Sequence, residues 1–109
     1  MKLYFYFLET YGANKGIKSA ECEVTEKPKT YHAVSKFPTG YYYSRVSKED
    51  IGHICGYAND VVITTEPNFE LAKRLFREKA VGKVRVAKKR LESEESILKA
   101  IEESEVANE

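Results

Sequence analysis

The longest continuous pattern in this sequence is helical, and it is long for a compact chain of 109 residues. From Thr65 to about Glu105, apolar residues recur in steps of three, four or seven, which is the spacing of one helical face. These residues are Phe69, Ala72, Phe76, Ala80, Val84, Ala87, Leu91, Leu98 and Ile101. About 39 residues of helix extend roughly 58 Å, whereas a compact domain of this size has a radius of gyration of about 13 Å. We therefore expect the helix to protrude, to fold back on itself, or to pair with a second copy.

Three residues set the expected shape of this helix. Thr65 is the expected N-cap, with Pro67 in the first turn, where its missing amide would have no intrahelical partner. Gly82 costs about 1 kcal/mol relative to alanine inside a helix, so it marks the expected kink or break. We favour either a break at Gly82 or a protruding arm that forms dimers, and the sequence leaves both open.

Charge divides the helical segment into two opposed blocks. Residues 73–90 contain nine basic side chains and one acidic side chain, whereas residues 91–109 contain seven acidic side chains and one basic side chain. The overall formal charge of +1 conceals this division. Pairing of the two blocks, within a hairpin or between two chains, would make use of both.

The first 64 residues carry the alternating pattern of β-strands. Residues 2–9 have strand-favouring aromatic side chains on both faces, which predicts a central strand. Residues 17–25 alternate between apolar and polar side chains, which is typical of a half-buried strand. Residues 11–16, with two glycines and Asn14, predict the turn that joins these strands into a hairpin.

Three further strands and one short helix are expected before the long helix. The strands lie at residues 30–34, 41–46 and 60–64, and the last of them leads into the long helix. The segment Ser47-Lys48-Glu49-Asp50 has the form of a capping box, which predicts a helix of one or two turns through Ile54.

These elements predict an α+β fold, in which a mostly antiparallel sheet of four or five strands precedes a long C-terminal helix. The length fits a single domain over residues 1–109, with a β-rich part (1–64) and a helical segment (65–105). Phe69, Ala72 and Phe76 are expected to pack the helix against one face of the sheet. The last residues, from 102 onward, are expected to fray.

The composition favours a soluble, cytoplasmic protein. The N-terminal run MKLYFYFL is too short and too aromatic for a signal peptide, and no cleavage site follows it. No stretch approaches the roughly 20 apolar residues of a membrane span. Two cysteines, Cys22 and Cys55, without a CxxC pair fit a reduced cytosolic protein.

Metal binding and nucleophilic catalysis both lack the residue spacing that they need. Cys22, His32, His53 and Cys55 are residue types that bind zinc, but their separations match no zinc-ligand pattern. Cys22 faces the core of the predicted sheet, where a free cysteine acts as a small apolar residue. A cysteine nucleophile would also need a nearby base and an orienting group, and no such motif is present. We expect no enzymatic activity, no metal and no cofactor.

Two candidate binding surfaces remain. The first is a tyrosine–arginine cluster with the composition of interface hot spots, comprising Tyr41, Tyr42, Tyr43, Arg45 and Tyr57. The second is a basic helix set that would contact nucleic-acid phosphates, comprising Lys73, Arg74, Arg77, Lys83, Arg85, Lys88, Lys89 and Arg90. The structural alternatives are tyrosines packed on the sheet and cations that solvate the outer face of an amphipathic helix.

Two runs of this chain, VSKEDIGHI (46–54) and VVITTEPNFELAKRLFREK (61–79), resemble small uncharacterised proteins encoded by phages and prophages of Gram-positive bacteria. The resemblance carries over no catalytic or binding residue. It implies a non-enzymatic accessory protein in the host cytoplasm that acts on a host or phage macromolecule. Inhibitors of bacterial defence systems, including anti-CRISPR proteins, are one such class.

Three functional hypotheses follow. The leading hypothesis is a binding protein whose partner is a host or phage protein, including a nucleoprotein complex. The alternatives are a nucleic-acid-binding protein that uses the basic helix set, and a homodimer formed through the apolar stripe from Val84 to Ile101.

Overall fold

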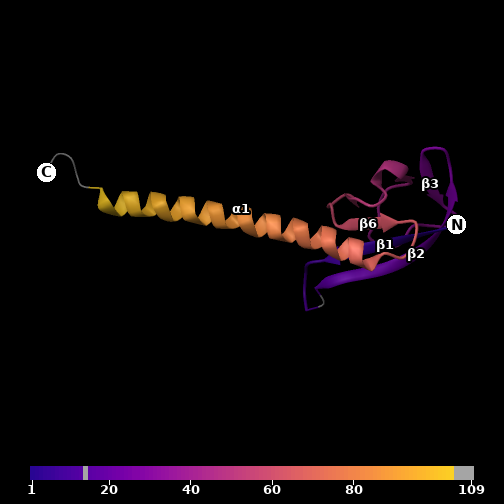
Figure 1. Ribbon diagram of the computed structural model, residues 1–109, viewed down its shortest axis with the longest axis horizontal. Coiled ribbons are helices and arrows are strands. Elements are labelled where there is room, and N and C mark those ends of the chain that lie inside the picture. Colours follow the sequence, from indigo (N-terminus) through magenta and orange to yellow (C-terminus); the bar gives the residue numbers. More distant parts are fainter. Residues whose placement is uncertain (14, 105–109) are drawn as a thin grey trace. The chain divides into compact units, whose positions relative to one another are not determined.

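The computed structural model describes residues 1–13 and 15–104, and these residues form an α+β fold (Figure 1). They contain six β-strands, one 3-10 helix and one long α-helix. The predicted fold class is therefore confirmed, with six strands in place of four or five. Asn14 of the predicted turn and residues 105–109 of the predicted frayed end lie outside the described residues. The chain divides into two compact units, Met1–Arg77 and Glu78–Glu109.

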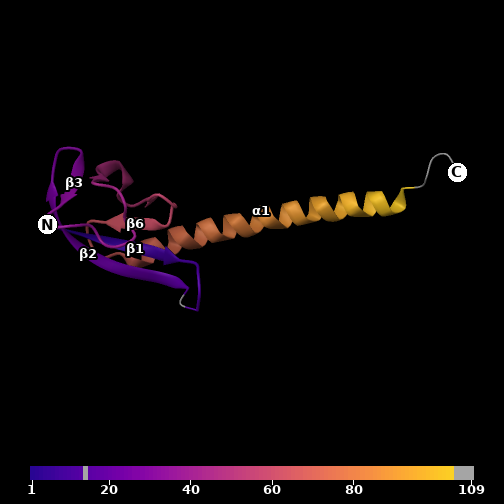
Figure 2. The same ribbon diagram turned by 180° about the vertical axis from the view of Figure 1, so that it is seen from behind.

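The first unit is built on a sheet with the strand order β4-β3-β2-β1-β6-β5, in which every pairing is antiparallel. The strands are β1 (Lys2–Glu9), β2 (Gly16–Glu26), β3 (Thr30–Ala33), β4 (Val46–Ser47), β5 (Ile54–Cys55) and β6 (Val61–Thr64). β1 pairs with β2 along its whole length and with β6 along part of it. The view from behind shows β1 between β2 and β6 (Figure 2). The predicted hairpin and the central position of residues 2–9 are confirmed.

β1 contributes to a hydrophobic cluster on each face of the sheet, because successive side chains of a strand point to opposite faces. Leu3 and Phe5 are fully buried on one face, in the larger cluster. Tyr6 is buried on the other face, together with Ala72 and Phe76 from the first turns of the helix α1 (Phe69–Glu103). The beginning of α1 thus covers the second face, as the sequence predicts.

The helix α1 is continuous through Gly82, so the break considered there does not form. Alanine, lysine, arginine, leucine and glutamate make up most of the helix, and these strong helix formers outweigh the penalty of about 1 kcal/mol for one glycine. The predicted N-cap at Thr65 is wrong. The N-cap is Asn68, whose Oδ1 accepts a hydrogen bond from the backbone N–H of Leu71 at 3.2 Å. Pro67 disfavours a helical conformation of Glu66, the residue before it, so a helix that starts at Glu66 with Thr65 as its cap is disfavoured.

The predicted strand over residues 41–46 is wrong for most of its length. Only Val46 belongs to a strand, β4, and residues 41–45 form a loop. The Tyr41 hydroxyl donates a hydrogen bond to the backbone carbonyl of Arg45 at 2.9 Å, which closes the loop on itself. Gly40 precedes the loop with a φ of 107°, a conformation that reverses the chain and that other residues rarely adopt.

The predicted helix after Ser47 is shorter than expected. It is the 3-10 helix η1 (Lys48–Asp50), and the Ser47 hydroxyl accepts a hydrogen bond from the backbone N–H of Glu49, as a capping residue does. Ile51 is extended and ends the helical conformation, and Gly52 follows with a φ of 80°. The chain then forms β5, a two-residue strand that the sequence did not indicate.

Candidate functional site

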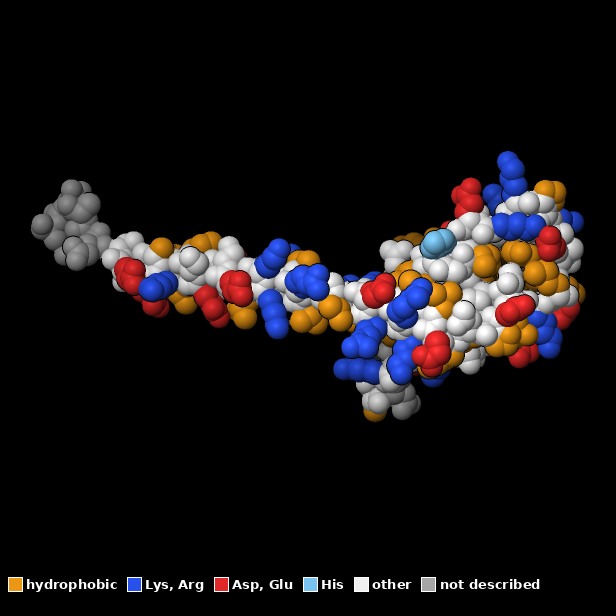
Figure 3. Space-filling model, viewed as in Figure 1, with side chains coloured by type: hydrophobic (Ala, Val, Ile, Leu, Met, Phe, Trp, Pro, Cys, Tyr) orange, Lys and Arg blue, Asp and Glu red, His pale blue; other side chains and the backbone are white. Residues whose placement is uncertain are grey.

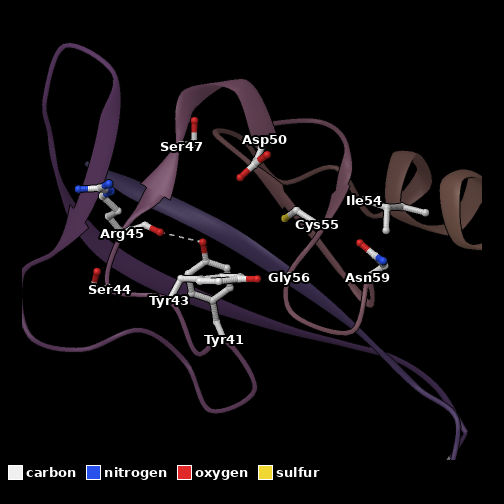
Figure 4. A pocket seen from close by; sticks show the side chains of 10 residues that line it. All are labelled: Tyr41, Tyr43, Ser44, Arg45, Ser47, Asp50, Ile54, Cys55, Gly56 and Asn59. Carbon is white, nitrogen blue, oxygen red and sulfur yellow. Dashed lines mark hydrogen bonds between the residues drawn. The ribbon is translucent and has the colours of Figure 1, made fainter.

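Residues 41–59 of the first unit surround an open cavity of about 590 Å³ (Figure 4). Its walls come from the 41–45 loop, from η1 and from the segment around β5. The lining residues are Tyr41, Tyr43, Ser44, Arg45, Ser47, Asp50, Ile54, Cys55, Gly56 and Asn59. Figure 4 shows the Asp50 carboxylate and the Cys55 sulfur pointing toward the two tyrosine rings from the opposite wall. Among the described residues, neither Arg45 nor Asp50 forms an ion pair, so both charges can meet a ligand.

The structure brings part of the predicted tyrosine–arginine cluster to this cavity. Tyr41 is buried, and its ring packs edge-on against that of Tyr43 with centroids 5.7 Å apart. Tyr43 and Arg45 are exposed and line the cavity. Tyr42 and Tyr57 follow or precede lining residues in the chain and are highly exposed, without lining the cavity themselves. Tyr41 therefore supports the surface from below, and the other four side chains can contact a partner.

Asp50, Cys55 and Asn59 also line the cavity, although the predicted cluster did not include them. The sequence carries one weak signal for them. Two glycines, Gly52 and Gly56, have positive φ and break the chain into tight turns between η1 and β6. Those glycines indicate a loop region, but they do not indicate which other loop lies beside it.

Burial raises the pKa of two weakly acidic groups in the cavity wall, the Cys55 thiol and the Tyr41 hydroxyl. Burial, with smaller effects of Asp50 and Asp60, raises the pKa of the Cys55 thiol to about 12. Burial also raises the pKa of the Tyr41 hydroxyl, with smaller effects of Cys55, Asp50 and Tyr43. Because the thiolate is the nucleophilic form of cysteine, a thiol with so high a pKa is a poor nucleophile near neutral pH.

The four residues considered as zinc ligands do not converge. Cys22 and Cys55 are buried and are not joined by a disulfide. The Cys22 thiol lies 3.4 Å from the backbone carbonyl of Lys36, to which it donates a hydrogen bond. The Nε2 atom of His32 lies 3.1 Å from the hydroxyl of Thr30. Within residues 1–13 and 15–104, no three His, Cys, Asp or Glu side chains are placed to hold a metal ion.

The basic helix set lies on exposed positions of α1. Figure 3 shows its blue side chains along the helix, interspersed with orange hydrophobic ones, and red acidic side chains nearer the C-terminal end. Lys73, Arg74 and Arg77 belong to the first unit and the other five to the second. None of the eight forms an ion pair with another described residue. At 3.6 residues per turn the eight positions are distributed around more than half of the helix circumference, so they do not form one basic face.

Comparisons of this chain with protein-family models, with curated proteins and with solved structures found no match in any of the three. In the part of the chain that the structure describes, no helix has the length and apolar character needed to cross a membrane. The function is therefore inferred from the surfaces of the molecule itself.

Proposed function

We propose that this chain is a non-enzymatic accessory protein that binds another protein through the tyrosine–arginine cluster of its first unit. The exposure of Tyr42, Tyr43 and Tyr57, at 79%, 50% and 82%, is the observation that carries the proposal. Tyrosine and arginine are enriched among the side chains that dominate binding energy at protein interfaces. Tyrosine has two side-chain torsions and a large ring, so it gains contact area at a small loss of conformational entropy.

The cavity beside these tyrosines defines the chemistry of the partner segment. Arg45 offers an exposed guanidinium without an ion-pair partner among the described residues, and this group forms strong hydrogen bonds with carboxylates. Asp50 offers an acceptor on the opposite wall. A partner segment with an acidic side chain and a neighbouring hydrogen-bond donor would satisfy both groups.

The particular role that we propose is that of a phage- or prophage-encoded protein in the cytoplasm of a Gram-positive host. The resemblance of residues 46–54 and 61–79 to such proteins supports this role. The partner would then be a host or phage protein, including a nucleoprotein complex of a defence system that the chain inhibits.

Removing two of the exposed tyrosines tests this proposal. We expect the combined substitutions Tyr42→Ala and Tyr57→Ala to weaken partner binding by about tenfold or more, because truncation of a hot-spot side chain costs about 2 kcal/mol or more. The measurement is quantitative mass spectrometry of host proteins retained by the immobilised chain, followed by the dissociation constant for each protein that the wild type retains.

Tyr11 provides the matched control, since it is 90% exposed but lies in the turn between β1 and β2. The Tyr11→Ala chain is expected to retain the same proteins as the wild type. If the double variant and the Tyr11→Ala chain retain them equally well, the tyrosine–arginine cluster is not the binding surface.

A second candidate function is nucleic-acid binding by the basic helix set. The observation that favours it is the exposure of these cations without an ion-pair partner among the described residues. Cations of this kind bind phosphates and release condensed counterions, which makes the affinity depend steeply on salt.

Charge reversal on the helix tests this second function. We expect Lys88→Glu combined with Lys89→Glu to abolish binding to fluorescent single- or double-stranded DNA or RNA, measured by anisotropy at low and physiological salt. Reversal of the exposed Lys27 and Lys29, between β2 and β3, is the control and should leave the affinity nearly unchanged. Absence of wild-type binding at low salt would exclude this function.

A further inference from the structure

The second unit is a helix that leaves its apolar side chains exposed. Among its described residues, 78–104, none is buried. Leu91 and Ile101, for example, are 58% and 65% exposed. Most helices in proteins are stabilised by packing of an apolar face rather than by intrinsic propensity. The apolar side chains of this unit therefore have no cover within the described part of the chain.

These apolar side chains repeat with the period of a coiled coil. Spacings of four and three residues alternate over three heptads, at Ala80, Val84, Ala87, Leu91, Glu94, Leu98 and Ile101. Positions with this alternation form the seam along which two helices supercoil. Glu94 is the one polar residue in the seam. The pattern indicates a helix that pairs with another helix along one side.

The charges of the unit identify the second helix and its direction. Residues 79–90 carry six basic side chains and no acidic one, whereas residues 91–103 carry five acidic side chains and one basic one. In a parallel pair of two copies, each block would lie beside the block of like charge. In an antiparallel pair, the basic block of each copy lies beside the acidic block of the other.

We propose that this unit forms an antiparallel two-helix coiled coil with the same unit of a second copy of the chain. The register that aligns the seams and the charge blocks is centred between residues 92 and 93. It places Val84 against Ile101 of the second copy and Ala87 against Leu98, so that a small residue meets a large one. It also brings Lys88 beside Glu95 of the second copy, twice by symmetry.

In this register Glu94 shares a layer with Leu91 of the second copy, next to Arg90. A single polar residue in a seam fixes the register of a coiled coil and lowers its stability. Glu94 therefore favours the register in which it lies opposite Leu91 of the second copy, because its carboxylate can there pair with the guanidinium of Arg90. This inference rests on the second unit alone and does not depend on the proposed function of the first.

Cross-linking between two variants, each with one exposed cysteine added to the buried Cys22 and Cys55, tests both the partner and the direction. Val84→Cys and Ile101→Cys chains, one with a longer tag, are mixed and treated with a short bismaleimide. We expect the mixed cross-link to dominate and sedimentation to give a dimer. The wild-type chain, whose cysteines are buried, measures the background. Cross-links only between identical variants would show a parallel pair, and a monomer at high concentration would overturn the proposal.

A change within the seam gives an independent measurement. We expect Glu94→Leu to lower the dimer dissociation constant by about tenfold or more, because it replaces a polar seam residue by an apolar one at two sites. Glu92→Leu removes the same charge on the side of the helix that faces away from the seam, and should not tighten the dimer. Equal dissociation constants for the two variants would contradict the proposed seam.

Discussion

Replacing Phe5 by alanine is expected to lower the free energy of unfolding of the first unit by about 3–5 kcal/mol, the usual effect of removing a buried aromatic ring. Phe5 is fully buried in the middle of β1. Its ring lies 5.8 Å from that of Phe37 and 5.4 Å from that of Tyr41, measured between centroids. Because small domains are stable by only about 5–15 kcal/mol, this single change removes a large part of the total.

Urea denaturation followed by the near-ultraviolet circular dichroism of the tyrosines measures this loss, since the tyrosines lie in the sheet and its loops. Phe69→Ala is the matched control, because Phe69 is about half exposed and packs edge-on against Tyr6. We expect it to cost about 1 kcal/mol, the contribution of a partly buried aromatic pair. Equal denaturation midpoints for Phe5→Ala and Phe69→Ala would contradict the central place of Phe5 in the hydrophobic core.

The Phe5→Ala substitution is also expected to affect the candidate site, because Phe5 packs against Tyr41. Tyr41 packs against Phe5 and Phe37 below the cavity and holds the 41–45 loop closed through its hydrogen bond to Arg45. Loss of the Phe5 ring removes one side of this packing. The position of Tyr43 and Arg45 at the cavity therefore depends on the interior of the sheet.

The hairpin of β1 and β2 could be predicted because its side chains alternate with a simple rule. Cys22 and Val24 are buried, whereas Glu21 and Glu23 between and beside them are exposed. A one-residue shift of register would bury these carboxylates, so the pattern selects one arrangement. The first turns of α1 were predictable for the same reason, since Ala72 and Phe76 form an apolar face that the sheet covers.

The errors lie where distant contacts decide the local conformation. Residues 41–45 contain strand-favouring tyrosines, but the burial of Tyr41 beside Phe5 converts them into a loop. At the start of α1, the Tyr6 hydroxyl accepts a hydrogen bond from the backbone N–H of Asn68 at 2.8 Å. Tyr6 and Asn68 are far apart in the sequence, so the residue pattern around Thr65 could not indicate this hydrogen bond.

The candidate site was predictable only in its residue types. The tyrosine–arginine cluster is visible as a run in the sequence, and the structure places Tyr43 and Arg45 at a cavity. The opposite wall depends on the pairing of β5 with β6, which brings Cys55 beside Val61. A two-residue strand is too short to show a periodic pattern, so Cys55 could not be assigned to the site in advance. Asp50 lies in η1, and the capping box that predicts this helix does not indicate which loop the helix faces.

Substituting alanine for Gly56 is expected to destabilise the first unit by several kcal/mol and to deform the cavity that Gly56 lines. Gly56 has a φ of 92°, and a left-handed conformation costs a residue with a Cβ atom about 1–2 kcal/mol. An added Cβ would also lie 2.8 Å from Cγ2 of Val61, which is fully buried and β-branched and therefore has little room to move. Overpacking of this kind costs about 1–3 kcal/mol more.

Gly12→Ala separates the two contributions, because Gly12 has a similar φ of 75° but an added Cβ there would meet none of the described residues within 4 Å. The control should therefore show the conformational loss alone, and the difference in urea midpoint between the two variants should report the contact with Val61.

Because Val61 pairs with Cys55, its displacement moves the wall that carries Cys55. We thus expect Gly56→Ala, and not Gly12→Ala, to weaken binding of any protein retained through Tyr42 and Tyr57. Equal stability of Gly56→Ala and Gly12→Ala would mean that the segment around Gly56 shifts at no cost in free energy. The cavity would then not be a preformed site.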